Sequence, residues 1–236
     1  MARLCIVLPC YNPQPGWVET IISTSNSILD KDPNILLEII LVNDGSTKGI
    51  SPSDIKLLHS ELPSFHYIHY KNNYGKGHAL RMGVGSAEGK YIIVTDVDFP
   101  YEDEAVLEIY KRLLTGEADV CLGVRSERYY KKIPVFRKHL SKAFKYITRK
   151  VFKLPVSDTQ CGIKGFNTKG REVFLQTSIN RYLFDLEFVF LLSKACHLNV
   201  VPIDVKLKPG IVFSRISLKI LVKESVNFLR LVLKMY

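Results

Sequence analysis

The chain has 236 residues, 47% hydrophobic and 24% charged, so it is long and apolar enough to bury a core, and it is neither disordered nor fibrous. Its net charge of +10 is uneven: residues 1–124 carry 10 basic and 16 acidic side chains, whereas residues 125–153 carry 11 basic and one acidic. Residues 154–236 add a further +6. A basic second half suggests a polyanionic partner, such as a nucleic acid, an anionic lipid or a phosphorylated substrate, and it is equally compatible with a solvated basic face that serves solubility.

The cysteines and the first residues indicate the compartment. Five cysteines are spread along the chain without a C-x-x-C pair, which is typical of reduced thiols rather than of a disulfide framework or a zinc site. The N-terminus lacks the cleavage site of a signal peptide, and no apolar run reaches the roughly 18–20 residues of a membrane-spanning helix. We therefore expect a cytoplasmic protein.

Apolar runs alternate with helical segments over the first half of the chain. Each run predicts a buried strand that ends in a polar turn. The expected strands are 3–8, 35–42, 65–70, 91–95 and 118–124, and the expected helices are 16–30, 52–61, 76–88 and 101–114. This order predicts an α/β fold with a mostly parallel, doubly wound sheet. The polar turns that follow the strands should gather at one edge, where such sheets bind ligands.

Two acidic residues, Asp96 and Asp98, stand one residue apart directly after the expected strand 91–95. Carboxylate oxygens are hard ligands that suit Mg²⁺ or Mn²⁺. One acid can bind a cation while the other holds a ribose hydroxyl or a water. The same D-x-D pair also occurs by chance in many loops, so the pair alone leaves both interpretations open.

Other polar turns are candidates for nucleotide contacts. Asp44 ends a strand and can accept hydrogen bonds from a ribose or base, or it can form an Asx turn or a helix cap. The glycine-bearing loop before Lys76 and Arg81 can place a helix N-terminus against a phosphate. The chain has no Walker A loop and no G-x-G-x-x-G after its first strand, which argues against an ATPase and a nicotinamide dehydrogenase.

Seven motifs in order resemble the family-2 glycosyltransferases. The later ones narrow the resemblance to the polyprenyl-phosphate sugar transferases, especially the dolichyl-phosphate glucosyltransferases. The motifs are Pro9-Cys-Tyr-Asn12, Val42-Asn-Asp-Gly-Ser46, Asn73-Tyr-Gly-Lys-Gly77, Asp96-Val-Asp98, Gly123-Val-Arg125, Ser157-Asp-Thr-Gln-Cys-Gly-Ile-Lys164 and Phe184-Asp-Leu-Glu187. The resemblance implies a Rossmann-like, A-type glycosyltransferase fold with one domain over 1–215. Its nucleotide-sugar-binding half would be 1–124, its acceptor-binding half 125–215, and an amphipathic C-terminal helix would follow over 216–236.

The resemblance also implies roles for individual residues. The residues that would bind a UDP- or GDP-hexose donor are Pro9, Tyr11, Asn12, Asp44, Lys76, Arg81 and Asp96. Asp98 would hold Mg²⁺ or Mn²⁺ on the diphosphate. Asp158, Gln160 and Glu187 would form the sugar and acceptor pocket, and Asp185 would lie near the reaction centre.

Residues 125–153 contain an apolar stripe and a basic stripe at helical spacing. A basic amphipathic helix is typical of a membrane surface, with about 1 kcal/mol per basic residue near anionic headgroups, although the apolar stripe alone is more typical of a core helix. Residues 216–236 carry a wide apolar face that should pack against the domain, lipid or a second copy. We expect peripheral contact with the inner face of a membrane, with a homo-oligomer as an alternative.

The acceptor decides the chemistry. A polyprenyl phosphate is already anionic, so its oxygen can attack the sugar C1 without a general base and invert that centre. Arg125 and Arg137 could clamp the acceptor phosphate, because guanidinium groups bind phosphate with two parallel hydrogen bonds. A sugar hydroxyl would instead need a base, for which Asp185 is the candidate.

Three other functions compete with this one. The first is a family-2 enzyme that glycosylates a saccharide during cell-surface polysaccharide synthesis, with the same donor. The second is a nucleic-acid-binding module, which would leave the acids at the strand ends unexplained because carboxylates repel a phosphate backbone. We therefore expect no nucleic-acid partner. The third is a catalytically inactive membrane scaffold, against which the intact pair Asp96 and Asp98 argues.

Overall fold

The computed structural model describes residues 3–125, 161–181 and 183–209. Arg137, Asp158 and Gln160 lie outside the described residues, as do the amphipathic segments expected within 126–153 and over 216–236. Arg125, at the start of the basic segment, is described.

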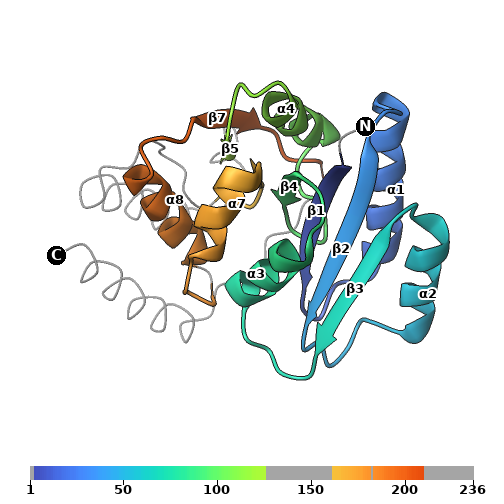
Figure 1. Ribbon diagram of the computed structural model, residues 1–236. Helices are drawn as coiled ribbons and strands as arrows, with labels where there is room; N and C mark the ends of the chain where they lie inside the picture. Colours follow the sequence, from blue (N-terminus) through green and yellow to red (C-terminus); the bar gives the residue numbers. More distant parts are fainter. Residues whose placement is uncertain (1–2, 126–160, 182, 210–236) are drawn as a thin grey trace.

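A mixed sheet of seven strands forms the centre of the described part, in the order β3-β2-β1-β4-β6-β5-β7 (Figure 1). The strands are β1 (Arg3–Cys10), β2 (Leu36–Asp44), β3 (Phe65–Tyr70), β4 (Tyr91–Val94), β5 (Val120–Arg125), β6 (Lys164–Phe166) and β7 (Val200–Val205). The helices are α1 (Trp17–Lys31), α2 (Pro52–Glu61), α3 (Lys76–Ser86), α4 (Asp103–Leu114), α7 (Thr168–Leu175) and α8 (Phe184–Lys194).

The pairing of the strands confirms the expected mostly parallel α/β sheet. Strand β1 pairs in parallel with β2 and with β4, and β2 pairs in parallel with β3. Strand β5 pairs in parallel with β7. Strand β6 runs antiparallel to both of its neighbours, β4 and β5. The five strands and four helices expected in the first half are confirmed within a few residues at each end. The sequence analysis predicted none of β6, β7, α7 and α8.

Helices cover both faces of the sheet, as Figure 1 shows. Leu4, Ile6 and Leu8 of β1 pack with α1, α2 and α4, whereas Cys5 and Val7 pack with α3, α7 and α8. Since both sides of β1 are buried, its sequence is a continuous apolar run rather than an alternating one.

Helix α3 lies unusually close to the sheet. A Cβ atom on Gly83 would stand 2.3 Å from Cγ1 of Val7 and 3.0 Å from Cγ2 of Val42, so only glycine fits at this position. This close packing fixes α3 along β1 and β2. It also holds the first residue of α3, Lys76, at the edge where these strands end.

The carboxyl ends of β1, β2, β3, β4 and β5 share one edge of the sheet, as the parallel topology requires. Because β6 runs the other way, it begins at this edge. The segment before β6, with Cys161 and Gly162, therefore reaches the edge at which Arg125 ends β5. This edge holds the candidate site.

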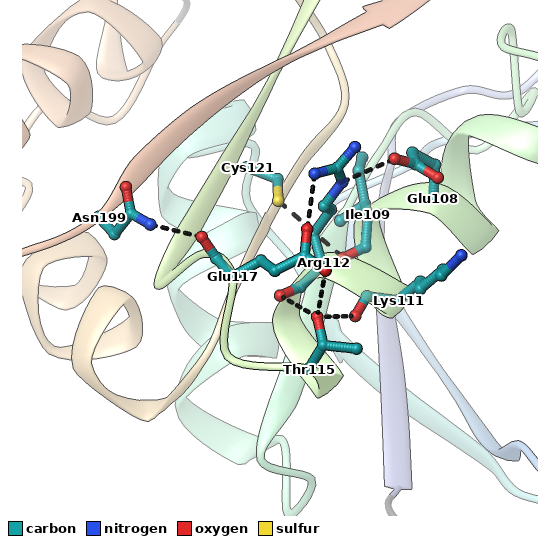
Figure 2. A network of polar contacts seen from close by, with 8 residues as sticks. All are labelled: Glu108, Ile109, Lys111, Arg112, Thr115, Glu117, Cys121 and Asn199. Atoms are coloured by element: carbon teal, nitrogen blue, oxygen red, sulfur yellow. Dashed lines mark hydrogen bonds and ion pairs between the residues drawn. The ribbon is translucent and has the colours of Figure 1, made fainter.

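The opposite edge is closed by a polar network at the end of α4 (Figure 2). Arg112 binds Glu108 at 2.7 Å and Glu117 at 2.6 Å, and Asn199 donates a hydrogen bond to the backbone oxygen of Glu117. These contacts join α4 to the starts of β5 and β7, far along both strands from the candidate site. Within the described residues, no helix has the length and apolarity needed to cross a membrane.

Candidate active site

The turn after β1 is joined to the turn after β2 through Asn12. Its backbone amide donates to Oγ of Ser46 at 2.9 Å, and its Oδ1 accepts from the amides of Thr47 and Lys48 at 2.9 and 3.2 Å. Asn12 has φ of 47°, a left-handed conformation that asparagine tolerates better than most residues. The same turn leaves the ring of Tyr11 52% exposed at the sheet edge.

Asp44 is buried at the end of β2 and organises the loop after β3. Its Oδ1 accepts from the amide of Tyr74 at 2.9 Å, and its Oδ2 accepts from the amide of Gly75 and from Nδ2 of Asn73, both at 2.8 Å. Burial and then the Asp44 charge raise the pKa of the nearby Tyr70. The carboxylate thus fixes a loop contributed by another strand, a role that the sequence left unassigned.

The two acids after β4 have different surroundings. Oδ1 of Asp96 lies 2.5 Å from Nζ of Lys76. Asp98 is exposed as a residue. Partial burial of its carboxyl group, and then the negative charge of the neighbouring Asp96, raise its pKa above the ordinary value. The turn is closed by the amide of Phe99, which donates to the backbone oxygen of Asp96 at 3.0 Å. Phe99 is buried with φ of 40°, a strained conformation for a bulky residue.

The N-terminus of α3 does not present free amides to a phosphate. The amides of Gly77 and His78 donate to the backbone oxygen of Asn180, at 2.8 and 3.3 Å. Asn180 belongs to the loop between α7 and α8, so this loop caps the helix that the sequence analysis placed against a phosphate.

Arg81 and Glu187 both hold the same loop. Nη1 of Arg81 donates to the backbone oxygen of Ile179 at 2.9 Å, and Nη2 donates to Oδ1 of Asn180. Glu187, in the first turn of α8, accepts from the amides of Ser178 and Ile179 at 2.8 and 2.7 Å. Burial lowers the pKa of Arg81, and the Glu187 charge acts in the opposite direction. The structure therefore gives both residues the same role, which is to hold the loop that caps α3.

Asp185 forms a buried ion pair with Lys164 of β6. Lys164 is 1% exposed, and its Nζ also donates to the backbone oxygen of Cys161 at 2.6 Å. The sequence analysis did not single out Lys164 as a site residue. Two signals were available: Lys164 ends the motif that begins at Ser157, and it is a lysine within an otherwise apolar and glycine-rich segment, 161–166.

The segment before β6 lies against Asp96. A Cβ on Gly162 would stand 2.7 Å from Oδ2 of Asp96, and the Gly162 amide donates to the Tyr101 hydroxyl at 2.9 Å. Burial raises the pKa of Tyr101 well above its ordinary value, while the Arg125 guanidinium acts in the opposite direction. Arg125 is thus within electrostatic range of this cluster.

The structure therefore places Asp44, Asp96 and Asp98 at one edge of the sheet, where Lys76 pairs with Asp96 and Arg125 ends β5. The exposed carboxylate of Asp98 offers hard oxygen donors beside a second carboxylate, Asp96, which fits Mg²⁺ or Mn²⁺. Magnesium is commonly bound by one or two carboxylates, with substrate phosphates and waters completing its shell.

Several curated proteins with similar sequences carry the name dolichyl-phosphate beta-glucosyltransferase. The proteins of this name from Dictyostelium discoideum, Saccharomyces cerevisiae and Homo sapiens are 27%, 25% and 26% identical to this chain, over 81%, 85% and 80% of its length. The chain covers 62%, 66% and 62% of those proteins, less than two thirds of their length.

Solved structures share the fold. Mannosyl-3-phosphoglycerate synthase from Rubrobacter xylanophilus superposes with a TM-score of 0.67 at 16% identity, over 98% of this chain and 73% of its own. Glucosyl-3-phosphoglycerate synthase from Mycobacterium tuberculosis, in complex with Mn²⁺, UDP-glucose and phosphoglyceric acid, gives 0.65 at 16% identity, over 99% and 79%. These similarities confirm the A-type glycosyltransferase fold. The family model described as Glycosyl transferase family 2 matches residues 5–174, most of the chain, and the chain therefore belongs to that family.

Proposed function

We propose that this chain is an inverting glycosyltransferase that moves a hexose from a nucleoside-diphosphate sugar to a polyprenyl phosphate. The observation that carries the proposal is the placement of Asp96, Asp98, Lys76 and Arg125 at one sheet edge, with Lys76 paired to Asp96, in a chain with relatives named dolichyl-phosphate beta-glucosyltransferase. Glucose is the first hexose to test, since these relatives are named for it.

The donor would lie along the ends of β1, β2 and β4. Pro9 and Asn12 would shape the turn beside the nucleoside, and the exposed ring of Tyr11 is available to stack on its base. Asp44 would act by holding the loop that carries Tyr74 and Gly75. Asp96 would face the ribose or the sugar, with its charge balanced by Lys76.

Asp98 would hold Mg²⁺ or Mn²⁺ on the donor diphosphate. When bound, the cation would stabilise the charge on the departing nucleoside diphosphate. The chain itself would mainly position the two reactants for in-line attack, because the acceptor phosphate is already an anion. No general base is then required, which agrees with the engagement of Asp185 by Lys164.

The acceptor side would begin at Arg125, a half-buried cation at the end of β5. Its guanidinium suits a phosphate oxygen pair. Arg137 would complete the clamp, Glu187 would support the wall of the pocket, and Asp158 and Gln160 would contact the transferred sugar. The basic segment 125–153 would place the enzyme at the cytoplasmic face of a membrane, where a polyprenyl phosphate is available.

A two-way acceptor screen tests the proposal. Purified protein is incubated with UDP-glucose or GDP-mannose, Mn²⁺ or Mg²⁺, and either a short-chain polyprenyl phosphate in detergent or a panel of free saccharides. We expect a metal-dependent glycolipid product with inverted anomeric configuration from one of the donors. Transfer to a saccharide, with none to the lipid phosphate, would replace the proposal with the polysaccharide alternative.

A further inference from the structure

We propose that Lys164 is a positioning residue, whose ion pair with Asp185 holds the turn 161–163 against Asp96. This inference rests on the proposed function, because it concerns the carboxylate that would meet the donor. In this role, Lys164 and Asp185 act together without transferring a proton and without touching the substrate.

The first step is the burial of the pair. Lys164 is 1% exposed and Asp185 is 7% exposed, so both charges are removed from water. Such burial is costly unless the charges are paired and hydrogen-bonded, and the described partners of Lys164 are the Asp185 carboxylate and the Cys161 backbone oxygen. The two side chains join β6 to the first turn of α8.

The second step is the reach of Lys164 back along its own chain. The ladder bonds of β6 align Lys164, Gly165 and Phe166 with both neighbouring strands, whereas the residues before the strand lie outside those registers. The 2.6 Å hydrogen bond from Lys164 to Cys161 closes that preceding turn. The buried ion pair then fixes the lysine that makes this bond.

The third step is the contact between the turn and the site. Gly162 follows Cys161 and abuts Asp96, since an added Cβ would stand 2.7 Å from Oδ2. Lys76 holds the other carboxylate oxygen, Oδ1. Asp96 thus has the Lys76 ammonium at one carboxylate oxygen and the Gly162 backbone beside the other, so the position of the turn limits how far the carboxylate can move in that direction.

Two kinds of variant separate positioning from stability. The double variant Lys164→Met/Asp185→Leu removes both charges and keeps much of the side-chain volume, so its melting temperature should lie well above that of Lys164→Met alone, which leaves an unpaired buried carboxylate. Its affinity for UDP or GDP in the presence of Mn²⁺ should still fall by about 10-fold, the low end of the loss expected when a hydrogen bond from the ligand to a carboxylate is displaced.

Gly162→Ala tests the same contact without touching the ion pair. The added methyl group should displace the Asp96 carboxylate and weaken Mn²⁺-dependent nucleotide binding to a similar extent. Gly85→Ala is the matched control, because Gly85 lies in α3 and its added Cβ would meet no atom within 4 Å. In steady-state kinetics, the KM for the donor should rise in the double variant and in Gly162→Ala, while the KM for the acceptor stays unchanged.

Calorimetry with Mn²⁺ and each nucleoside diphosphate gives separable outcomes. If the wild type binds but the double variant and Gly162→Ala bind equally well, the positioning role is wrong and the pair serves only packing. If the wild type binds no nucleoside diphosphate in the presence of metal, the proposed function fails, and this inference fails with it.

Discussion

The backbone amide of Gly75 donates a hydrogen bond to Oδ2 of Asp44 across 2.8 Å. This contact joins the end of β2 to the loop after β3, so a side chain of β2 fixes the course of the loop that follows β3. The carboxylate receives further hydrogen bonds from Tyr74 and Asn73, which leaves the loop with a charged anchor at its centre.

Asp44→Asn should therefore lower the free energy of unfolding. The amide side chain loses the charge that strengthens these hydrogen bonds, and hydrogen bonds to charged groups contribute about 1.5–3 kcal/mol. Urea unfolding measures the change, with Asp30→Asn, an exposed site in α1, as the control. Unchanged stability together with weakened donor binding would show that Asp44 serves the ligand rather than the loop.

Asp98→Ala should abolish metal-dependent nucleotide binding and transfer while leaving the fold intact. Asp98 is exposed in a turn at the sheet edge, so removal of its side chain leaves no buried cavity. Calorimetry with Mn²⁺ and a nucleoside diphosphate measures the effect. Glu104→Ala, an exposed acid in the first turn of α4, is the control. Unaltered binding by Asp98→Ala would overturn the assignment of the metal to this residue.

Arg125→Ala should raise the KM for a polyprenyl phosphate and leave donor affinity nearly unchanged. Loss of a charge-assisted contact with phosphate costs about 1.5–3 kcal/mol, or roughly 10- to 150-fold in kcat/KM. The Arg125/Arg137 double variant should be affected more strongly. Arg171→Ala is the control, since Arg171 is a half-buried arginine of α7 that donates to the backbone oxygen of Gly85. Normal kinetics of the Arg125 variants with the lipid phosphate would exclude the clamp.

Thiol labelling should distinguish Cys196 from the other four cysteines. Cys196 is exposed, whereas Cys5, Cys10, Cys121 and Cys161 are buried. Burial raises the pKa of Cys5, Cys10 and Cys121 to about 12, and the thiolate is the reactive form.

One thiol per chain should therefore react rapidly with an alkylating reagent near neutral pH, and all five should react in denaturant. Mass spectrometry after a timed quench counts the labels, and Cys196→Ser should remove the fast phase. A second fast label on the native protein would mean that part of the core opens during labelling.

The sequence predicts the first half of the fold well because four of its strands, β1, β2, β4 and β5, are largely buried on both faces, whereas the edge strand β3 is indicated by its aromatic and β-branched residues. Strands buried on both faces appear as uninterrupted apolar runs, and each run here ends in a recognisable turn. Strand β6 was missed because it has three residues and begins with a lysine, which resembles a loop. Strand β7 contains Pro202 and Asp204, which weaken a strand pattern.

The candidate site was predictable in its location but not in its internal contacts. The acids follow strands, and parallel topology alone brings their side chains to one edge. In contrast, the cap of α3 by Asn180 and the pairing of Lys164 with Asp185 join residues distant in sequence. Neither contact has a local pattern, because each depends on how α8 and β6 pack against the first half.

The antiparallel direction of β6 has an evolutionary consequence. Residues 126–160 are 35 in number, and the described residues on either side of them, Arg125 and Cys161, both lie at the carboxyl edge of the sheet. The pairing of β5 with β6 therefore does not fix how many residues join them. Variation in the length of this interval over evolution is compatible with an unchanged order of the strands on either side.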